Sequence, residues 1–193
     1  MADTNKIKYG IKNVYYAKAT IASDGTATYG TPTAIPGAVS ISLDAQGENT
    51  PFYADNIVYY MAANNNGYEG DLEVAKLPDA FLKDIYGMTL DDNDVLIEDL
   101  NAGAVHFALM FQFEGDVHAK RHVLYNCTAT RPSLSSETKA DTIEPKTDTI
   151  TITATSIHIA GLNKDVVKAS CTPTEATQYN AWLTTVYEPV VST

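Results

Sequence analysis

The side-chain alternation in residues 105–113 constrains the fold of this chain more than any other feature. Val105 and every second residue up to Phe113 are large and apolar, and the positions between them hold His, Ala, Met and Gln. A period of two is that of a β-strand, whose successive side chains point to opposite faces. We therefore expect this segment to form a strand with unlike faces at the centre of an antiparallel sheet.

The same period recurs along the chain, and turn-forming residues separate the segments that have it. It is found in residues 39–44, 123–128 and 149–155, and Gly, Pro, Asn or Asp residues cluster in residues 23–25, 35–37, 64–67 and 92–94. Many short strands divided by turns are typical of a sandwich or a barrel. The predicted fold class is mainly β, an antiparallel β-sandwich or partial barrel. No low-complexity linker divides the chain, so we expect residues 1–193 to form a single domain.

One short segment breaks this pattern and predicts a flanking α-helix. Pro78 stands where a helix can begin, Gly87 stands where it can end, and Phe81, Leu82 and Ile85 share one face between them. We expect these three side chains to anchor the helix on the sandwich, with Leu82 as a buried leucine.

A second helix is possible near the C-terminus. In residues 174–183 and just beyond, Tyr179, Trp182, Leu183 and Val186 would fall on one side of a helix. The β-branched residues from position 184 to 186 favour a strand instead, so both structures stay open there.

The charge of the chain argues against nucleic acid and membranes as partners. Its formal net charge is −11, from 24 acidic and 13 basic residues. Such a surface repels a phosphate backbone, which makes specific nucleic-acid binding unexpected. No apolar run has the length of a membrane-spanning helix, and residues 1–8 are polar where a secretory signal would be apolar. We expect a protein that is made and kept in the cytoplasm until its release.

Motifs for catalysis, cofactors and metals are missing from the sequence. It has no G-x-S-x-G elbow, no phosphate-binding P-loop and no G-x-G-x-x-G before a helix. His118 and His122 flank a turn, but a third metal ligand at suitable spacing is missing. Residues 91–98 faintly resemble a calcium loop but lack its glycine, and they instead predict a hairpin turn that enters a strand. Cys127 and Cys171 have no metal-binding spacing and should be buried free thiols. We expect no enzymatic activity, no catalytic or metal-binding residues and no cofactor.

Residues 46–66 are rich in aromatic side chains and poor in charge. The chain holds 12 Tyr against 5 Phe and 1 Trp, and tyrosine suits surfaces that become half-buried in an assembly. The large side chains of this stretch are Phe52, Tyr53, Tyr59, Tyr60 and Met61. They indicate a surface that packs against a partner, and the alternative is a hairpin of the protein's own core.

Six segments together closely resemble one protein family. They are KYGIKNVYYA (8–17), GTPTAIPGAVSISLDAQGE (30–48), FYADNIVYY (52–60), NNGYEGDLEVAKLPDAF (65–81), FALMFQFEGD (107–116) and RHVLYNCTATRP (121–132). The chain resembles the major tail proteins, or tail tube proteins, of siphoviruses that infect Gram-positive bacteria. The similarity runs from about residue 6 to residue 156, with the blocks in the family's order.

The resemblance implies a structural subunit of a bacteriophage tail tube. In such proteins six subunits form a ring, the inner strands of the ring join into one β-barrel, and the rings stack around the tape-measure protein as a conduit for DNA ejection. The implied partners are other copies of the chain, the tape-measure protein, and the tail-tip and tail-terminator proteins, with DNA only as passing cargo. The implied location is the virion tail, assembled in the host cytoplasm. A C-terminal arm would span about residues 160–193, with no additional immunoglobulin-like domain.

Within this family, residues 46–66 are expected to make inter-subunit contacts, and residues 68–74 are candidates for the wall of the bore. Strand alternation puts Glu69, Asp71 and Glu73 on one face, and Tyr68, Leu72 and Val74 on the other. The three carboxylates would face the lumen, and the alternative is an ordinary solvated strand. A second functional interpretation of the whole chain, a carbohydrate- or surface-binding β-sandwich module of a tail tip or adhesin, would also be acidic, rich in tyrosine and free of catalytic motifs.

Overall fold

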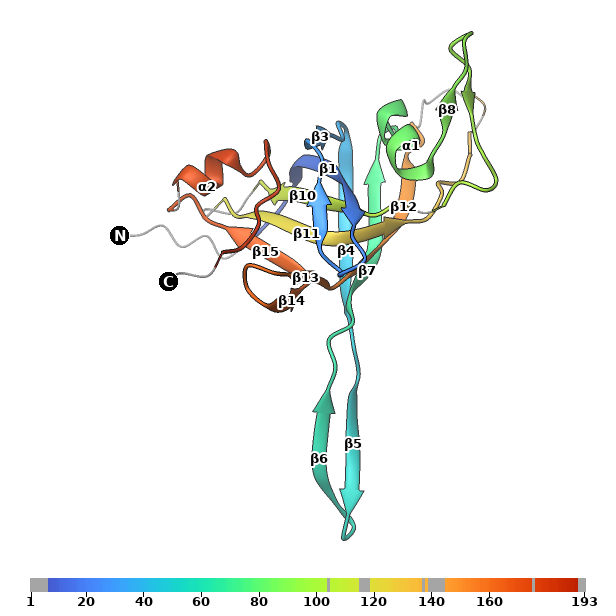
Figure 1. Cartoon of the computed structure of the whole chain (residues 1–193). Coiled ribbons are helices and arrows are strands. Elements are labelled where there is room, and N and C mark those ends of the chain that lie inside the picture. Colours follow the sequence, from blue (N-terminus) through green and yellow to red (C-terminus); the bar gives the residue numbers. More distant parts are fainter. Residues whose placement is uncertain are drawn as a thin grey trace.

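The computed structural model describes residues 7–103, 105–114, 119–136, 138, 145–174 and 176–190. This part of the chain is mainly β and antiparallel, with two short helices, which confirms the predicted fold class (Figure 1). The strands of the main sheet are β1 (Ile11–Ile21), β2 (Ala27–Tyr29), β3 (Thr33–Ala34), β4 (Ala38–Gln46), β7 (Gly67–Val74), β10 (Phe107–Phe113), β11 (Arg121–Ala129), β12 (Asp148–Thr155) and β15 (Lys168–Cys171). Three smaller pairs are β5 (Asn49–Ala54) with β6 (Ile57–Ala63), β8 (Thr89–Leu90) with β9 (Leu96–Ile97), and β13 (Ile157–Ile159) with β14 (Lys164–Val166).

The main sheet is curled and open. Its order is β2-β1-β10-β11-β12-β7-β4, with β3 paired to β1 and β15 paired to β11. The curl brings β4 close to β1 without pairing the two strands, so the sheet does not close into a barrel. The alternating segments predicted as strands lie in β4, β10, β11 and β12, and β10 runs inside the sheet between β1 and β11.

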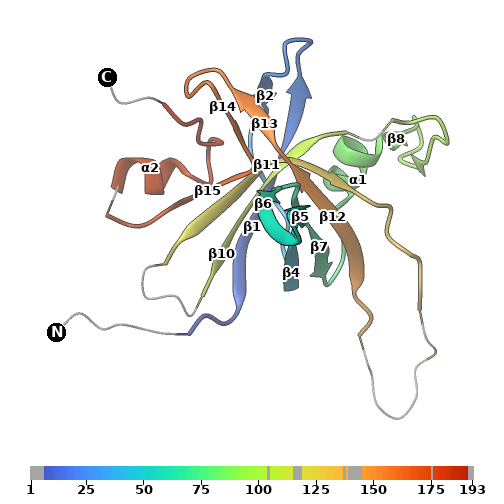
Figure 2. The same ribbon diagram turned by 90° about the horizontal axis from the view of Figure 1, so that it is seen from below.

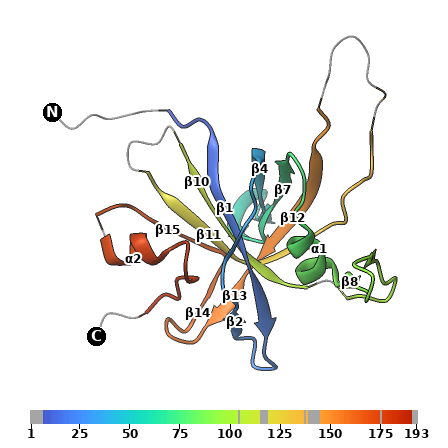
Figure 3. The same ribbon diagram turned by 90° about the horizontal axis from the view of Figure 1, so that it is seen from above.

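The unlike faces of β10 belong to two separate hydrophobic clusters. Phe107 and Leu109 lie in a first cluster inside the curl, together with side chains of β7, β12 and helix α1 (Asp79–Tyr86). Ala108 and Met110 lie in a second cluster, under Trp182 of the C-terminal segment. Both faces are therefore covered, and the apolar side chains of β10 from 107 to 110 are fully buried. Helices α1 and α2 (Ala176–Ala181) lie on opposite sides of the sheet (Figures 2 and 3).

Helix α1 confirms the helix that the sequence predicts. Pro78 is its N-cap residue, and Gly87 ends it with φ +67°, a left-handed conformation that glycine adopts at low cost. The ring of Phe81 is fully buried and packs edge-to-face on Tyr16 with ring centres 4.9 Å apart. The hydroxyl of Tyr16 donates a hydrogen bond to Asp84 Oδ2 over 2.8 Å, which ties the helix to β1.

The anchoring side chains of α1 are not equally buried. Phe81 and Ile85 are buried in the first cluster, whereas Leu82 is only partly buried at the margin of that cluster. The expectation of a fully buried leucine at position 82 is therefore wrong, because this side chain lies at the edge of the face that α1 turns to the sheet.

The C-terminal segment is helical only over residues 176–181. The threonines that follow end α2, and the hydroxyl of Thr184 donates to the carbonyl of Ala181 over 2.8 Å. Trp182 and Val186 are buried in the second cluster, and Tyr179 and Leu183 are partly buried against it. The apolar side predicted for this segment is thus present, although the helix itself is short.

Two local predictions are also confirmed. Cys127 and Cys171 are both buried and neither is in a disulfide, and burial raises the pKa of the Cys127 thiol well above its usual range. The segment that faintly resembles a calcium loop is the turn of the β8–β9 pair. There Asp91 Oδ1 accepts hydrogen bonds from the backbone N–H groups of Asn93 and Val95 over 2.9 and 2.8 Å.

The packing of α1 predicts a ranking of two substitutions. Phe81→Ala should lower the free energy of unfolding by about 3–5 kcal/mol, because it removes a fully buried ring from three edge-to-face contacts. Leu82→Ala should cost clearly less, since that side chain is partly exposed. Urea denaturation of the dispersed chain, followed by circular dichroism, measures both values. A larger loss for Leu82→Ala would contradict this packing.

Candidate functional site

A long, exposed hairpin leaves the body of the fold. Strand β4 continues into β5, and β6 returns into β7, so that the β5–β6 hairpin points away from the main sheet (Figure 1). Its turn consists of Asp55 and Asn56, which have φ values of +51° and +63°. Two successive positive φ angles belong to a type I′ turn, whose twist matches that of the paired strands.

Backbone geometry fixes the root of this hairpin. The N–H of Asn66 donates to Gln46 O over 2.8 Å, and the N–H of Gly67 donates to Asn65 Oδ1 over 3.1 Å. Gly67 has φ +96°, and a Cβ at this position would lie 1.9 Å from the carbonyl oxygen of Ala154. Only glycine therefore fits where the hairpin joins β7.

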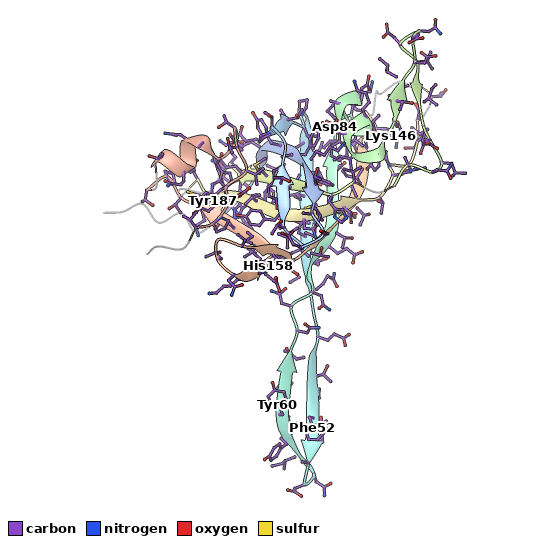
Figure 4. The ribbon with its side chains drawn as sticks, in the orientation of Figure 1. Phe52, Tyr60, Asp84, Lys146, His158 and Tyr187 are labelled. Carbon is purple, nitrogen blue, oxygen red and sulfur yellow. The ribbon has the colours of Figure 1, made fainter. Side chains whose placement is uncertain are left out.

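Large apolar side chains cover both faces of the hairpin and have no core to enter. Their exposed fractions range from 47% for Val58 to 71% for Tyr59. Figure 4 shows Phe52 and Tyr60 on the hairpin, far from the body of the protein. The full set is Phe52, Tyr53, Ile57, Val58, Tyr59, Tyr60 and Met61. The alternative of a core hairpin is therefore wrong, and this surface is one that an isolated molecule leaves uncovered.

A second feature is a polar face on the outside of the sheet. In β7 the side chains of Leu72 and Val74 are fully buried in the first cluster, and the three carboxylates of this strand lie on the opposite face. Antiparallel pairing extends that face to β4 and β12. Its three rows are Ser40–Glu73–Thr149, Ser42–Asp71–Thr151 and Asp44–Glu69–Thr153. We call these nine residues the acidic face, since it holds four carboxylates, five hydroxyl groups and no basic side chain.

Hydroxyl groups hold two of these carboxylates in place. Thr151 Oγ1 donates to Asp71 Oδ1 over 2.8 Å. Thr147 Oγ1 and Ser40 Oγ donate to the two oxygens of Glu73 over 2.6 and 2.9 Å. These hydrogen bonds, first that from Thr147 and then that from Ser40, hold the pKa of Glu73 below its usual value. Glu73 therefore keeps its charge well below neutral pH.

Sequence reasoning identified only part of each surface. In the hairpin it missed Ile57 and Val58, although their position between the aromatic residues was a signal for them. In the acidic face it missed the contributions of β4 and β12. The alternation of both strands is visible in the sequence, but the register that aligns them with β7 is not.

The described part of the chain offers few side chains for metal binding and no membrane-spanning helix. No group of three or more His, Cys, Asp or Glu residues there could hold a metal ion. His122 stacks on the ring of Phe111 with ring centres 5.2 Å apart, whereas His118 lies outside the described residues. Among those residues, no helix has the length and apolar character to cross a membrane.

The exposure of the hairpin predicts a stability-neutral double substitution. Replacing Tyr59 and Tyr60 by serine should change the free energy of unfolding of the dispersed chain by no more than about 0.5 kcal/mol, because neither ring is buried in the fold. Urea denaturation measures this change. A loss of several kcal/mol would mean that the hairpin stabilises the body of its own molecule.

Comparison with known proteins assigns the chain to a family. A search of curated proteins gives no match. A family model described as "Phage tail tube protein" matches residues 2–192, nearly the whole chain. An open antiparallel sheet with an uncovered hairpin is a structure suited to assembly, and the match extends over every element described above. The chain therefore belongs to the phage tail tube protein family and is a structural component of the virion tail.

Proposed function

We propose that this tail tube protein forms rings, six copies to a ring, that stack around the tape-measure protein and give DNA its path out of the virion. The observation that carries the proposal is the β5–β6 hairpin, which exposes seven large apolar side chains on both of its faces. A large exposed apolar surface marks an interaction site, because its burial against a partner is favourable in water. In a tube whose wall is made of one protein, the available partner is another copy.

The open edge of the main sheet supports ring closure. Strand β4 ends the order of the sheet and pairs only with β7 among the described strands. Its other edge presents unpaired backbone N–H and C=O groups, which are prone to pair with another chain. Pairing with a neighbouring subunit would satisfy them, and a head-to-tail contact repeated around an axis closes into a ring.

The acidic face supports a role as the wall of the bore. Under this proposal Glu69, Asp71 and Glu73 point into the lumen, where each ring presents six copies of the face. Electrostatic repulsion acts over a Debye length of about 10 Å at moderate salt and keeps the phosphate backbone of DNA away from the wall. DNA then moves through the tube without binding to it.

The partners, the place of assembly and the lack of catalysis are part of the same proposal. The tape-measure protein would occupy the bore before ejection, and tail-tip and tail-terminator proteins would cover the two ends of the tube. Assembly would take place in the cytoplasm of a bacterial host, and the protein would catalyse no reaction. We favour assembly over the alternative of a carbohydrate- or surface-binding module, because the match to the tail tube family covers residues 2–192.

Tube formation should depend on the hairpin. The Tyr59→Ser/Tyr60→Ser variant should form no tubes under conditions in which the wild-type protein forms them, because it loses apolar contact area between copies while the body stays folded. Negative-stain electron microscopy and sedimentation measure this. Leu134→Ser/Val190→Ser is the matched control, since it also removes two exposed apolar side chains, but outside the hairpin. Normal tubes from the hairpin variant would refute its role in assembly.

DNA delivery should depend on the charge of the acidic face. Replacing Glu69, Asp71 and Glu73 by lysine should leave tubes in place but slow DNA ejection by about tenfold or more, because a cationic wall attracts phosphate. The neutral variant Glu69→Gln/Asp71→Asn/Glu73→Gln separates attraction from lost repulsion and should have a smaller effect. Phage carrying each variant are compared in an ejection assay, and tubes by electron microscopy. Unchanged ejection through lysine-lined tubes would show that this face is not the wall of the bore.

A further inference from the structure

We propose that the β5–β6 hairpin of one copy binds a groove on the body of a second copy, between the strand pairs β4–β7 and β10–β11. The inference rests on the proposed function and names the partner surface of the hairpin. The groove has a volume of about 370 Å³. It is lined chiefly by Ile41, Leu43, Tyr68, Phe111, Phe113 and Leu124, with Lys8 and Lys168 beside them. We call it the lysine-rimmed groove.

The groove is an open end of the protein's own core. Ile41, Leu43, Tyr68 and Phe113 are only partly buried, yet all four pack against the first hydrophobic cluster. Apolar side chains that entered the groove would extend that cluster and cover these four residues. Burial of this kind stabilises a contact by about 25 cal/mol for each Å² of apolar surface removed from water.

The charges on the two surfaces are complementary. Residues 46–66 contain two charged side chains, Glu48 and Asp55, and both are acidic. The groove carries the ammonium group of Lys8 4.9 Å from the ring centre of Phe113, and that of Lys168 4.4 Å from the ring centre of Tyr68. No described residue forms an ion pair with either lysine. Both cations are thus held over aromatic rings, where an incoming carboxylate can reach them.

The occupant must come from another molecule. The hairpin is the continuation of β4 and β7, whose residues Ile41, Leu43 and Tyr68 line the groove. It points away from the body and does not fold back onto the strands from which it leaves (Figure 1). Every copy therefore offers one hairpin and one groove, which is the arrangement of a head-to-tail contact that repeats from copy to copy.

The other protrusion of the fold fits the groove less well. The β8–β9 pair also exposes aliphatic side chains and is acidic, but it has no aromatic residue between positions 87 and 103. It is also held to its own body, because Arg131 forms a salt bridge of 2.6 Å with Glu98 and donates a hydrogen bond to the carbonyl of Asp99. Among the described residues, the β5–β6 hairpin has no such contact beyond its root, and its aromatic rings match the aromatic lining of the groove.

Photo-crosslinking in assembled tubes tests the position of the hairpin. Tyr60 is replaced by p-benzoylphenylalanine, which keeps an aromatic side chain, and tubes are grown from a mixture of ¹⁵N-labelled and unlabelled protein before irradiation. Mass spectrometry should find crosslinks between copies that join position 60 to residues 41–43, 68, 111–113 or 122–124. The same analogue at Leu134, an exposed position outside both surfaces, should not give these crosslinks.

The outcomes of this experiment are distinct. Tubes in which position 60 crosslinks to another segment, such as residues 87–103, overturn the groove as the binding site and leave the tube function intact. Failure of the wild-type protein to form tubes would count against the proposed function. If there were also no crosslink between copies, the inference would be overturned as well.

Charge reversal tests the same contact without a crosslinker. Lys8→Glu/Lys168→Glu should raise the critical concentration for tube growth about tenfold, and Glu48→Lys/Asp55→Lys should do the same. The variant with all four changes should return to within about threefold of wild type, because opposite charges again face each other. Lys76→Glu/Lys164→Glu, at two exposed lysines away from the groove, is the control and should have no effect. Normal growth of the first variant, or no recovery in the fourfold variant, would overturn the proposal.

Discussion

Burial of β10 and β11 on both faces is the constraint on which the rest of the structure depends. Leu109 and Met110 are neighbours in β10 that point to opposite sides, and both are completely buried. One side is covered by the curl of the sheet with α1, and the other by the C-terminal segment. Hydrogen bonds hold that segment down, since the hydroxyl of Tyr125 donates to Tyr187 O over 2.9 Å and Trp182 Nε1 donates to His122 O over 3.4 Å. A fully buried apolar side chain contributes about 1.5–3 kcal/mol to the stability of the fold. Because both of their faces are covered, β10 and β11 form the stable core of this small protein.

The β5–β6 hairpin, unlike β10 and β11, gains little stability from burial within its own molecule. A two-stranded ribbon is marginally stable in water, and this one exposes apolar side chains on both faces instead of burying one of them. Its shape comes from the strands β4 and β7, which are built into the sheet, and from the glycine at its root. The body can therefore fold without the hairpin's contacts, while the hairpin gains most of its stability only in the assembly that we propose.

Charge is distributed unevenly over the chain, and that distribution matters more than the net value of −11. The acidic face combines four carboxylates with hydroxyl groups that hydrogen-bond to two of them, whereas the groove carries two lysines over aromatic rings. Like charge on a wall keeps DNA moving, and unlike charge at a contact selects the partner and its orientation. The proposed tube uses both effects on surfaces that share strands β4 and β7.

The sequence alone determined the features that depend on neighbouring residues. Alternation predicted β4, β10, β11 and β12, and a proline and a glycine nine positions apart predicted α1. The aromatic stretch of residues 46–66 was visible because so many large side chains stand there with so little charge. Only the tertiary structure decided the features that join distant segments. Strand register assembled the acidic face from β4, β7 and β12, the curl created the groove, and the way α1 packs on the sheet left Leu82 at the margin of the core. The physical reason is that side-chain period reports on local backbone geometry, whereas register and burial depend on contacts between residues that are far apart in the chain.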